Sequence, residues 1–281
     1  MPNGAFKDSF RLSDYIAGSY GVIFFYPLDF NYISLTELLS LQKRMADFAA
    51  LDAKVVVLSC DSHLAHQAWR QMPSANNCLG ATDFPMIADM TRDVAHLFDV
   101  LVAEAIPEAA TIIVDRESKV IFQTRHDTAI GRNINRVLEV IKIYENDGRA
   151  PSAPIDQILL LEKNAANFAR LGCPIVAQSV DTDLNHPQWN RLPRDGNGQP
   201  HLSFPFLAGQ QPWPQHEGMT LAVREGLEFH STGLLMADRQ LLFEHHADRR
   251  IPRDFVEILR IVDAIRHHQT TGEVVPWEIA A

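Results

Sequence analysis

The side chains with the clearest chemical potential gather in one short segment, FYPLDFNYISLTE, which runs from Phe25 to Glu37. Ser34, Thr36 and Glu37 supply two hydroxyl groups and a carboxylate within four residues. Together with Arg132 they could hold a small ligand. A hydroxyl and a carboxylate also stabilise the first turn of a helix, the hydroxyl by capping and the carboxylate by its charge. A ligand pocket and a structural helix start are therefore both open interpretations.

Cysteine and histidine are the other candidate reactive residues. The chain has three cysteines, Cys60, Cys78 and Cys173, which form no CxxC pair and no metal-ligand spacing. Cys60 follows a predicted strand, where α/β sheets place ligand sites, and Cys78 lies in a predicted exposed loop, so both are candidate reactive thiols. His63 and His66 are three residues apart on a predicted helix, but no third ligand follows at a fixed spacing. We therefore predict neither a metal site nor a disulfide framework.

Alternating strand and helix patterns predict that these residues belong to an α/β fold. Short, nearly continuous apolar runs indicate buried strands, and apolar residues at helical spacing indicate amphipathic helices. In the first half the predicted strands are 22–26, 55–59, 111–114 and 120–123, and the predicted helices are 36–50, 63–71 and 134–144. In the second half the predicted helices are 155–171 and 253–266, and the predicted strands are 175–180, 234–237 and 241–244.

The chain matches itself without a gap when it is shifted by 120 residues. Lys43 to Pro73 reads KRMADFAALDAKVVVLSCDSHLAHQAWRQMP, and Lys163 to Pro193 reads KNAANFARLGCPIVAQSVDTDLNHPQWNRLP. Identical pairs include Phe48 and Phe168, Ser59 and Ser179, Asp61 and Asp181, and Trp69 and Trp189. This period is too long for a solenoid repeat and indicates two domain-sized copies in tandem.

The second copy begins at its first helix and has no counterpart of the segment 22–30. Its sheet is therefore expected to be smaller, or to be completed by the first copy. We predict a first domain over residues 1–150 and a truncated second domain over residues 151–281, with a stiff, proline-containing junction at 150–154.

Composition and charge limit the classes of function. Hydrophobic residues make up 46% of the chain and charged residues 21%, which is ordinary for a globular protein. The formal net charge is −10, and no run of Lys and Arg supplies the basic patch that nucleic acids require. No apolar run is long enough to cross a membrane, and the N-terminus lacks the pattern of a secretory signal. We therefore predict a cytoplasmic protein with no nucleic-acid partner and no membrane span.

The segment FYPLDFNYISLTE closely resembles the active-site segment of typical two-cysteine peroxiredoxins, the alkyl hydroperoxide reductase/thiol-specific antioxidant family, in which it reads roughly FYPLDFTFVCPTE. Further motifs that resemble this family follow in order along nearly the whole chain, among them RLSDY at 11–15, Asp61-Ser62, Ala88-Asp89, Gly131-Arg132 and GEVVP at 272–276. The resemblance implies a thioredoxin-like α/β fold in two tandem copies, with no cofactor.

The resemblance also points to positions at which this chain differs from the family. The cysteine that attacks peroxide corresponds to Ser34, and in the second copy to about Pro154. The arginine that lowers the thiolate pKa corresponds to Ala109 and, by an alignment on residues 234–238, to Thr232 in the second copy. The resolving cysteine corresponds to Val275.

Other family positions are kept, as Thr36, Glu37 and Arg132, with Arg253 matching Arg132 in the second copy. Attack on a peroxide needs a thiolate, and a serine hydroxyl, which is not ionised near neutrality, is a poor substitute. The nucleophile, its main cation and the resolving thiol are all missing. The sequence therefore predicts a catalytically degenerate member, a pseudoenzyme.

Three functions remain open. The leading hypothesis is a non-catalytic protein that binds protein partners, either by self-association through edge strands into an oligomer or by docking on another complex. The alternative is a weak thiol peroxidase or redox sensor that uses Cys60 or Cys78. The third is a binding module in which the pocket near Ser34, Thr36 and Arg132 holds a small anion or a peptide.

Overall fold

The chain forms two compact units. The structure, a computed structural model, describes residues 6–7, 9–72, 78–146, 154–180, 192–194, 196, 201–209, 218–226, 228–236 and 240–277. Unit 1 comprises Met1–Lys142 together with His267–Ala281, and unit 2 comprises Ile143–Arg266. These units differ from the predicted domains mainly at the C-terminal end, which belongs with unit 1.

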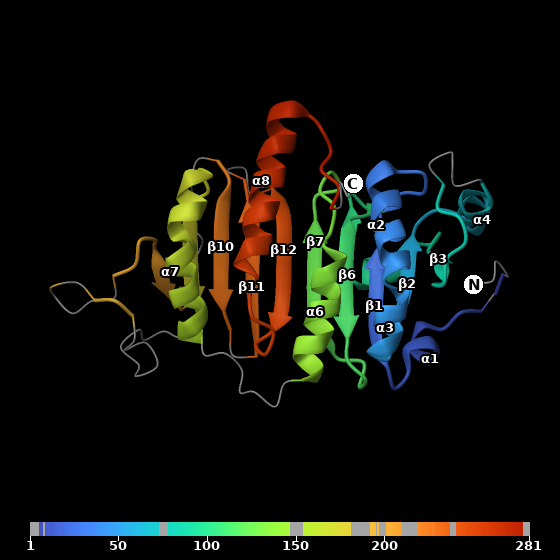
Figure 1. Cartoon of the computed structure of the whole chain (residues 1–281), viewed down its shortest axis with the longest axis horizontal. Helices are drawn as coiled ribbons and strands as arrows, with labels where there is room; N and C mark the ends of the chain where they lie inside the picture. The colour runs from blue at the N-terminus through green and yellow to red at the C-terminus, as the bar shows by residue number, and fades with distance from the viewer. Residues whose placement is uncertain are drawn as a thin grey trace. The chain divides into compact units, whose positions relative to one another are not determined.

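Unit 1 is built on a mixed β-sheet (Figure 1). The strand order is β3 (Met86–Ala88), β2 (Ala53–Ser59), β1 (Tyr20–Phe25), β6 (Ala109–Val114) and β7 (Val120–His126). β1, β2 and β3 are parallel, β6 is antiparallel to β1, and β7 is antiparallel to β6. β1 and β6 are buried along their whole length, as expected of central strands rich in Val, Ile and Phe.

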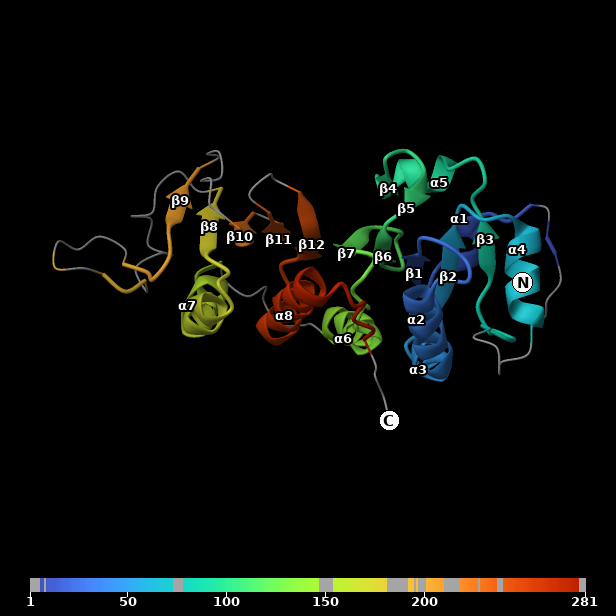
Figure 2. The same cartoon turned by 90° about the horizontal axis from the view of Figure 1, so that it is seen from above.

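Helices cover both faces of this sheet (Figure 2). On one face lie α2 (Tyr32–Lys43), α3 (Met45–Ala50) and α6 (Ile134–Glu145), and on the other lie α1 (Leu12–Ile16) and α5 (Asp93–Leu97). α4 (His63–Gln71) follows β2, and a short hairpin of β4 (Leu101–Val102) and β5 (Ile106–Pro107) follows α5. The single helix predicted over 36–50 is two helices, because the backbone of Arg44 leaves the helical region at φ −103° and ψ 5°.

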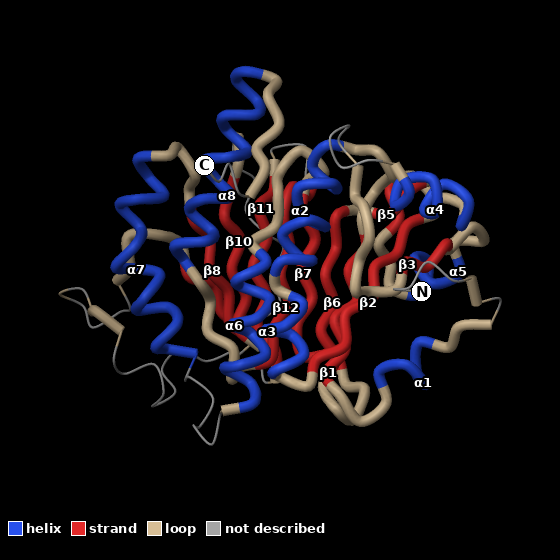
Figure 3. Tube along the Cα trace, turned by 45° about the vertical axis from the view of Figure 1, so that its right-hand side comes forward, coloured by secondary structure: helices blue, strands red, loops and turns tan. Residues whose placement is uncertain are grey.

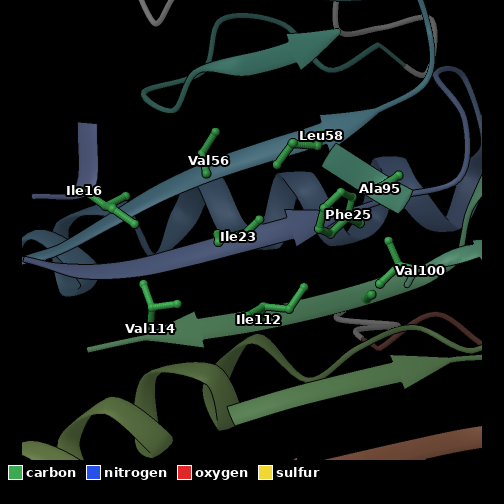
Figure 4. Close-up of a cluster of buried hydrophobic side chains, with 10 residues drawn as sticks. Ile16, Ile23, Phe25, Val56, Leu58, Ala95, Val100, Ile112 and Val114 are labelled. Carbon is green, nitrogen blue, oxygen red and sulfur yellow. The ribbon is translucent and has the colours of Figure 1, made fainter. Parts of the chain in front are cut away.

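A hydrophobic core lies between the sheet and the helices α1 and α5 (Figure 4). Ile16 from α1 and Ala95 from α5 pack against alternate residues of the central strands, namely Ile23, Phe25, Val56, Leu58, Ile112 and Val114. Since successive side chains of a strand point to opposite faces, this layer fixes the register of β1. The register of β1 in turn fixes the loop that follows it and the start of α2.

In unit 2 parallel and antiparallel strands lie in the order β9 (Phe206–Ala208), β8 (Ile175–Ser179), β10 (Thr220–Glu225), β11 (Phe229–Leu235) and β12 (Leu241–Asp248). α7 (Pro154–Arg170) and α8 (Phe255–Thr271) lie on one face of these strands, and the part of unit 2 that the structure describes has no helix on the other face (Figures 2 and 3). β11 begins at Phe229, earlier than the predicted strand 234–237. None of the described helices is both long and apolar enough to span a membrane.

β10 occupies the central position of the unit 2 sheet. It is parallel to β8 and antiparallel to β11, as β1 is parallel to β2 and antiparallel to β6. A strand from unit 2 itself therefore fills the central position between β8 and β11, which the sequence did not predict. An empty central position would leave backbone N–H and C=O groups of both neighbouring strands unpaired. β10 follows β8 and β9 in the chain, whereas β1 precedes every other strand of unit 1.

Candidate functional site

Ser34 lies in the first turn of α2, just after the loop that leaves β1. Asn31 is the N-cap of α2, and its side-chain oxygen accepts hydrogen bonds from Ser34 N at 3.0 Å and from Ser34 Oγ at 3.3 Å. The Ser34 side chain is fully buried. Its hydroxyl therefore stabilises the start of the helix rather than facing solvent.

Thr36 also satisfies its hydroxyl locally. Thr36 Oγ1 donates to the carbonyl oxygen of Ile33 at 2.8 Å. Such a bond to the preceding turn is common for threonine within a helix. The geometry of both hydroxyls favours the structural interpretation over a ligand pocket.

Glu37 and Arg132 form a buried, doubly hydrogen-bonded ion pair. Arg132 Nε donates to Glu37 Oε1 at 2.9 Å, Nη2 donates to Oε2 at 2.7 Å, and the backbone N–H of Arg132 donates to Oε1 at 2.7 Å. Nη1 donates to the carbonyl oxygen of Ala110 at 2.7 Å and to Thr111 Oγ1 at 3.2 Å. The guanidinium also lies 3.5 Å from the centroid of the Phe24 ring. The pair thus ties α2 to β6 and to the segment that enters α6.

This arrangement decides what Arg132 can do. Glu37 and Arg132 are each 1% exposed, and burial of a guanidinium is expensive unless it is paired and hydrogen-bonded. Four of the five guanidinium N–H groups are bonded, and the charge of Glu37 cancels that of Arg132. Arg132 therefore offers no free positive charge to a group at position 34 or to an anion.

Ala109 is the first residue of β6, at the position where the family resemblance expects an arginine. Its side chain is buried, and it pairs with His126 across the sheet. A methyl group supplies neither charge nor hydrogen bond, so this position adds no cation to the site.

The hairpin registers favour a different alignment from the one that matches Thr232 to Ala109. The register of the β6–β7 pair shifts between Ile113 and Val114, and that of the β11–β12 pair shifts between Leu234 and Leu235. When the two strand pairs are aligned at their register shifts, Thr232 corresponds to Thr111 and His230 corresponds to Ala109. Short apolar strands carry too little pattern to fix such a register from sequence.

Unit 2 contains a similar buried arginine. Arg253 Nε donates to Thr232 Oγ1 at 2.8 Å, Nη2 donates to two backbone carbonyls of β10 and β11 at 2.9 Å, and Nη1 is bonded to Glu225. The backbone N–H of Arg253 donates to Gln157 Oε1 at 3.1 Å. Gln157 lies on α7, 120 residues after Glu37, and its side chain is an uncharged amide. The carboxylate that pairs with Arg253 is therefore that of Glu225, on β10. Sequence reasoning missed Glu225, since no motif surrounds it.

Cys60 and Cys173 lie in surroundings that do not activate a thiol. Cys60 is half-buried at the end of β2, and burial together with the carboxylate of Asp89 raises the pKa of its thiol. Cys78, which the sequence predicts in an exposed loop, is buried instead, with 3% of its surface exposed. Burial raises the pKa of the Cys173 thiol to about 12. A thiol with a raised pKa is a poor nucleophile near neutrality.

The two histidines considered as a metal pair point apart. His63 is exposed and packs edge-on against Phe6, whereas His66 is buried with Nδ1 2.8 Å from Asp29 Oδ2. Tyr26 donates its hydroxyl to Asp29 Oδ1 at 2.8 Å, and burial followed by the Asp29 charge raises the pKa of Tyr26. This Tyr26–Asp29–His66 network links the loop after β1 to α4, and the sequence analysis did not predict it. Among the described residues, no cluster of three or more His, Cys, Asp or Glu could hold a metal.

Val275, at the position where the resemblance expects a resolving cysteine, lies against the segment that precedes Arg132. Gly131 N donates to the Val275 carbonyl at 2.8 Å, and Val275 N donates to the Ala129 carbonyl at 2.9 Å. Ile130 and Val275 form a parallel β-bridge. The structure therefore brings the C-terminal motif to the site, without a thiol.

Comparison with known proteins supplies the family. Residues 1–123 match the AhpC/TSA family. Peroxiredoxin 2 of Drosophila melanogaster is 35% identical over 144 residues, which are 51% of this chain and 73% of that protein. Alkyl hydroperoxide reductase C of Helicobacter pylori is 32% identical over 141 residues, 50% of this chain and 71% of that protein. Mycobacterium tuberculosis AhpC, a solved structure, is 31% identical and covers 50% of this chain and 77% of its own, with a TM-score of 0.45.

The first half of the chain thus has the thioredoxin-like α/β fold of the peroxiredoxins. The chain belongs to the AhpC/TSA family of peroxiredoxins. The matched region is about half of the chain and includes Ser34, Thr36, Glu37 and Ala109.

Proposed function

We propose that this chain is a peroxiredoxin-family protein that does not reduce peroxides by thiol chemistry and instead acts by binding proteins, as an assembly or regulatory subunit. The observation that carries the proposal is Ser34, a buried, hydrogen-bonded hydroxyl at the position of the family's nucleophile. The helix that presents it is intact, and the Glu37–Arg132 pair holds that helix in place.

The electrostatics of the site support this proposal. A reactive thiolate needs a nearby cation or backbone amides to lower its pKa. Ala109 supplies no charge, and the charge of Arg132 is cancelled by Glu37. One Cys-to-Ser exchange could be an isolated change, but the cation at 109 and the thiol at 275 are absent as well. Loss of three separate parts of one reaction argues for a lasting loss of that reaction.

The second unit is proposed to be a degenerate tandem copy of the first. Its support is the common order of parallel and antiparallel strand pairs, the shared register shift of the hairpins, and the paired Arg132 and Arg253 networks. Asp181 and Trp189, two residues of the sequence repeat, lie outside the described residues. In unit 2 the central strand runs into a hairpin, with Gly226 N bonded to the Phe229 carbonyl at 3.0 Å, rather than into a helix. That connection leaves no place for the loop that positions residue 34 in unit 1.

Binding to proteins remains the role best suited to such a scaffold. Self-association through strand edges, or docking on another complex in the cytoplasm, would use surfaces rather than the buried site. Native mass spectrometry of the purified chain and of complexes isolated with it tests this role. A protein that stays monomeric and without partners at cellular concentration would contradict it.

The catalytic half of the proposal is tested with stoichiometric hydrogen peroxide and a sulfenic-acid trap, read out as intact mass. We expect no adduct on the timescale of an active family member. A rapid adduct at Cys60 or Cys78 would establish the alternative, a peroxidase or redox sensor that uses a non-family cysteine. A variant with all three cysteines replaced by alanine is the control, since any turnover it retains does not come from a thiol.

A further inference from the structure

Unit 2 has a hollow that the proposed function does not use. Its cavity volume is about 490 Å³, which is within the range of small-molecule binding sites. It lies where α7 passes the start of β8 and the segment that leads into β9 (Figure 2). The residues that line it include Glu162, Ala165, Ala169, Pro174, Phe204 and Pro205.

The wall of the hollow is mostly apolar. Phe204 is buried and Pro174 is half-buried, while Ala165 and Ala169 lie one turn apart on α7 and end in methyl groups. Ala169 and Pro205 are exposed, so a ligand can enter from solvent. Flat rings and methyl groups together form a surface that suits an aromatic or other flat apolar group.

Glu162 gives the hollow a negative charge. Among the described residues that line it, no other side chain is charged. Glu162 Oε2 accepts hydrogen bonds from Ser203 N at 3.0 Å and from Ser203 Oγ at 2.9 Å. Both bonds go to one oxygen, and within the described part of the chain Oε1 accepts none. A carboxylate that is held in place in this way can accept a charge-assisted hydrogen bond from an ammonium group.

The sequence repeat indicates that the space belongs to unit 2. A shift of 120 residues matches Ala165 with Met45 and Pro174 with Lys54. Unit 1 therefore has a longer side chain at both positions. Methionine fills irregular gaps well, so the change from methionine to alanine opens room beside α7.

The charge is also specific to unit 2. Glu162 matches Gln42, whose side chain is an uncharged amide. Gln42 Oε1 accepts a hydrogen bond from Asp83 N at 2.8 Å, as Glu162 Oε2 accepts one from Ser203 N. Since glutamine makes the same backbone contact in unit 1, that contact does not require the negative charge of Glu162.

We propose that this hollow binds a small organic cation, in which an ammonium group donates to Glu162 and a flat apolar body lies against Phe204, Pro205 and the alanine methyl groups of α7. The net charge of −10 also favours the approach of a cation. The inference does not depend on whether the chain reduces peroxides.

One cation lies close to the hollow without lining it. A Cβ atom at Gly172 would lie 2.8 Å from Arg266 Nη1, and Gly172 immediately precedes Cys173, a lining residue. An anionic ligand that approached Arg266 is therefore the competing outcome, and an anionic probe distinguishes it from the proposal.

Titration of the full chain with phenethylamine, which is protonated at neutral pH, tests the proposal through the NMR signals of the alanine methyl groups. We expect saturable shifts at Ala165, Ala166 and Ala169, with a dissociation constant of about 1 mM or tighter. Phenethyl alcohol, which has the same shape and no charge, should bind at least about tenfold more weakly, and phenylacetate should not bind. No saturable shift with the amine, equal binding of amine and alcohol, or preferred binding of phenylacetate would overturn the proposal.

Two variants take their residues from unit 1. Glu162→Gln should weaken phenethylamine binding about tenfold and leave binding of phenethyl alcohol unchanged, because only the charge is removed. Ala165→Met should fill the hollow and abolish binding of both probes. Glu139→Gln, which removes an exposed carboxylate from unit 1, is the control and should change neither. Undiminished binding of the amine to Glu162→Gln, shown to be folded by circular dichroism, would contradict the proposal whether or not Ala165→Met folds.

Discussion

At the scale of residues, the hydroxyl and charged groups of the site bond to one another and to the backbone. The Ser34 hydroxyl donates a hydrogen bond to the helix cap Asn31, and Arg132 forms an ion pair with Glu37. Restoring a thiol alone should therefore not restore reactivity. We expect Ser34→Cys to react with hydrogen peroxide within about tenfold of the rate of a free cysteine, because no free cation lowers its pKa.

Adding Ala109→Arg to Ser34→Cys should raise that rate, because the new cation stabilises the thiolate. Competition kinetics with a sulfenic-acid trap measures both variants. If Ser34→Cys alone reacted as fast as an active family member, the view that Arg132 is unavailable would be wrong.

The Glu37–Arg132 pair should be important for stability. Glu37→Gln leaves the buried guanidinium without its counter-charge, which costs about 3–5 kcal/mol. Glu139→Gln is the matched control, since Glu139 is exposed and its bond to Arg136 contributes at most about 0.5 kcal/mol. Urea unfolding followed by hydrogen exchange in β1 and β6 measures the difference. Equal effects of the two variants would refute the structural role of the pair.

Cys173 should make stability fall in alkaline solution. Its folded-state pKa is about 12 against an ordinary value of 9.0, so between these values the unfolded chain releases a proton that the folded chain keeps. The free energy of unfolding then decreases as pH rises above 9, by up to about 1.4 kcal/mol per pH unit, and Cys173 makes no such contribution below pH 9. Cys173→Ala should lack this slope. Alanine is the residue at the matching position of the sequence repeat, Ala53, 120 residues earlier. Urea unfolding at pH 8, 9 and 10 measures it, and identical slopes would rule the effect out.

At the scale of elements, β10 is the least foreseen part of the structure. It supplies hydrogen bonds to β8 and β11 at once, and it brings Glu225 to Arg253. Val223→Pro should remove a ladder hydrogen bond in a central strand and deprotect the amides of β8 and β11.

Val256→Pro serves as the control for this substitution. Val256 is 78% exposed in the first turn of α8, where proline is tolerated. Proline there removes the bond from Val256 N to Asp254 Oδ1, and Glu257 N keeps its own bond to that oxygen. Hydrogen exchange reads out both variants. Unchanged protection of β8 and β11 in Val223→Pro would show that β10 is dispensable to the sheet.

At the scale of the whole molecule, charge sets the possible partners. The net charge of −10 opposes binding to a polyanion. We expect no retardation of a DNA duplex in a gel-shift experiment at about 50 mM salt, a condition that favours non-specific binding. A shift that weakens steeply as salt increases would reveal a basic surface and exclude this prediction.

The sequence by itself determined the α/β class, most element positions and the presence of serine at position 34 of the family motif, because these follow from local hydrophobic patterns and from motifs in order. Residues 63–71, for example, were predicted as a helix with the same bounds as α4. The sequence did not predict that Cys78 is buried, that His66 binds Asp29, or that Arg132 is fully paired. Each of these depends on side chains far apart in the chain.

Tertiary structure alone decided which strand fills the central position in unit 2. A vacant central position must be paired by some strand, but which strand does so depends on long-range backbone bonding that local pattern does not encode. The same holds for Gly131, whose need to be glycine is visible only when Trp277, 146 positions away in the chain, lies against it. The sequence identified the candidate reactive residues, and the fold decided the hydrogen bonds and ion pairs that hold their side chains.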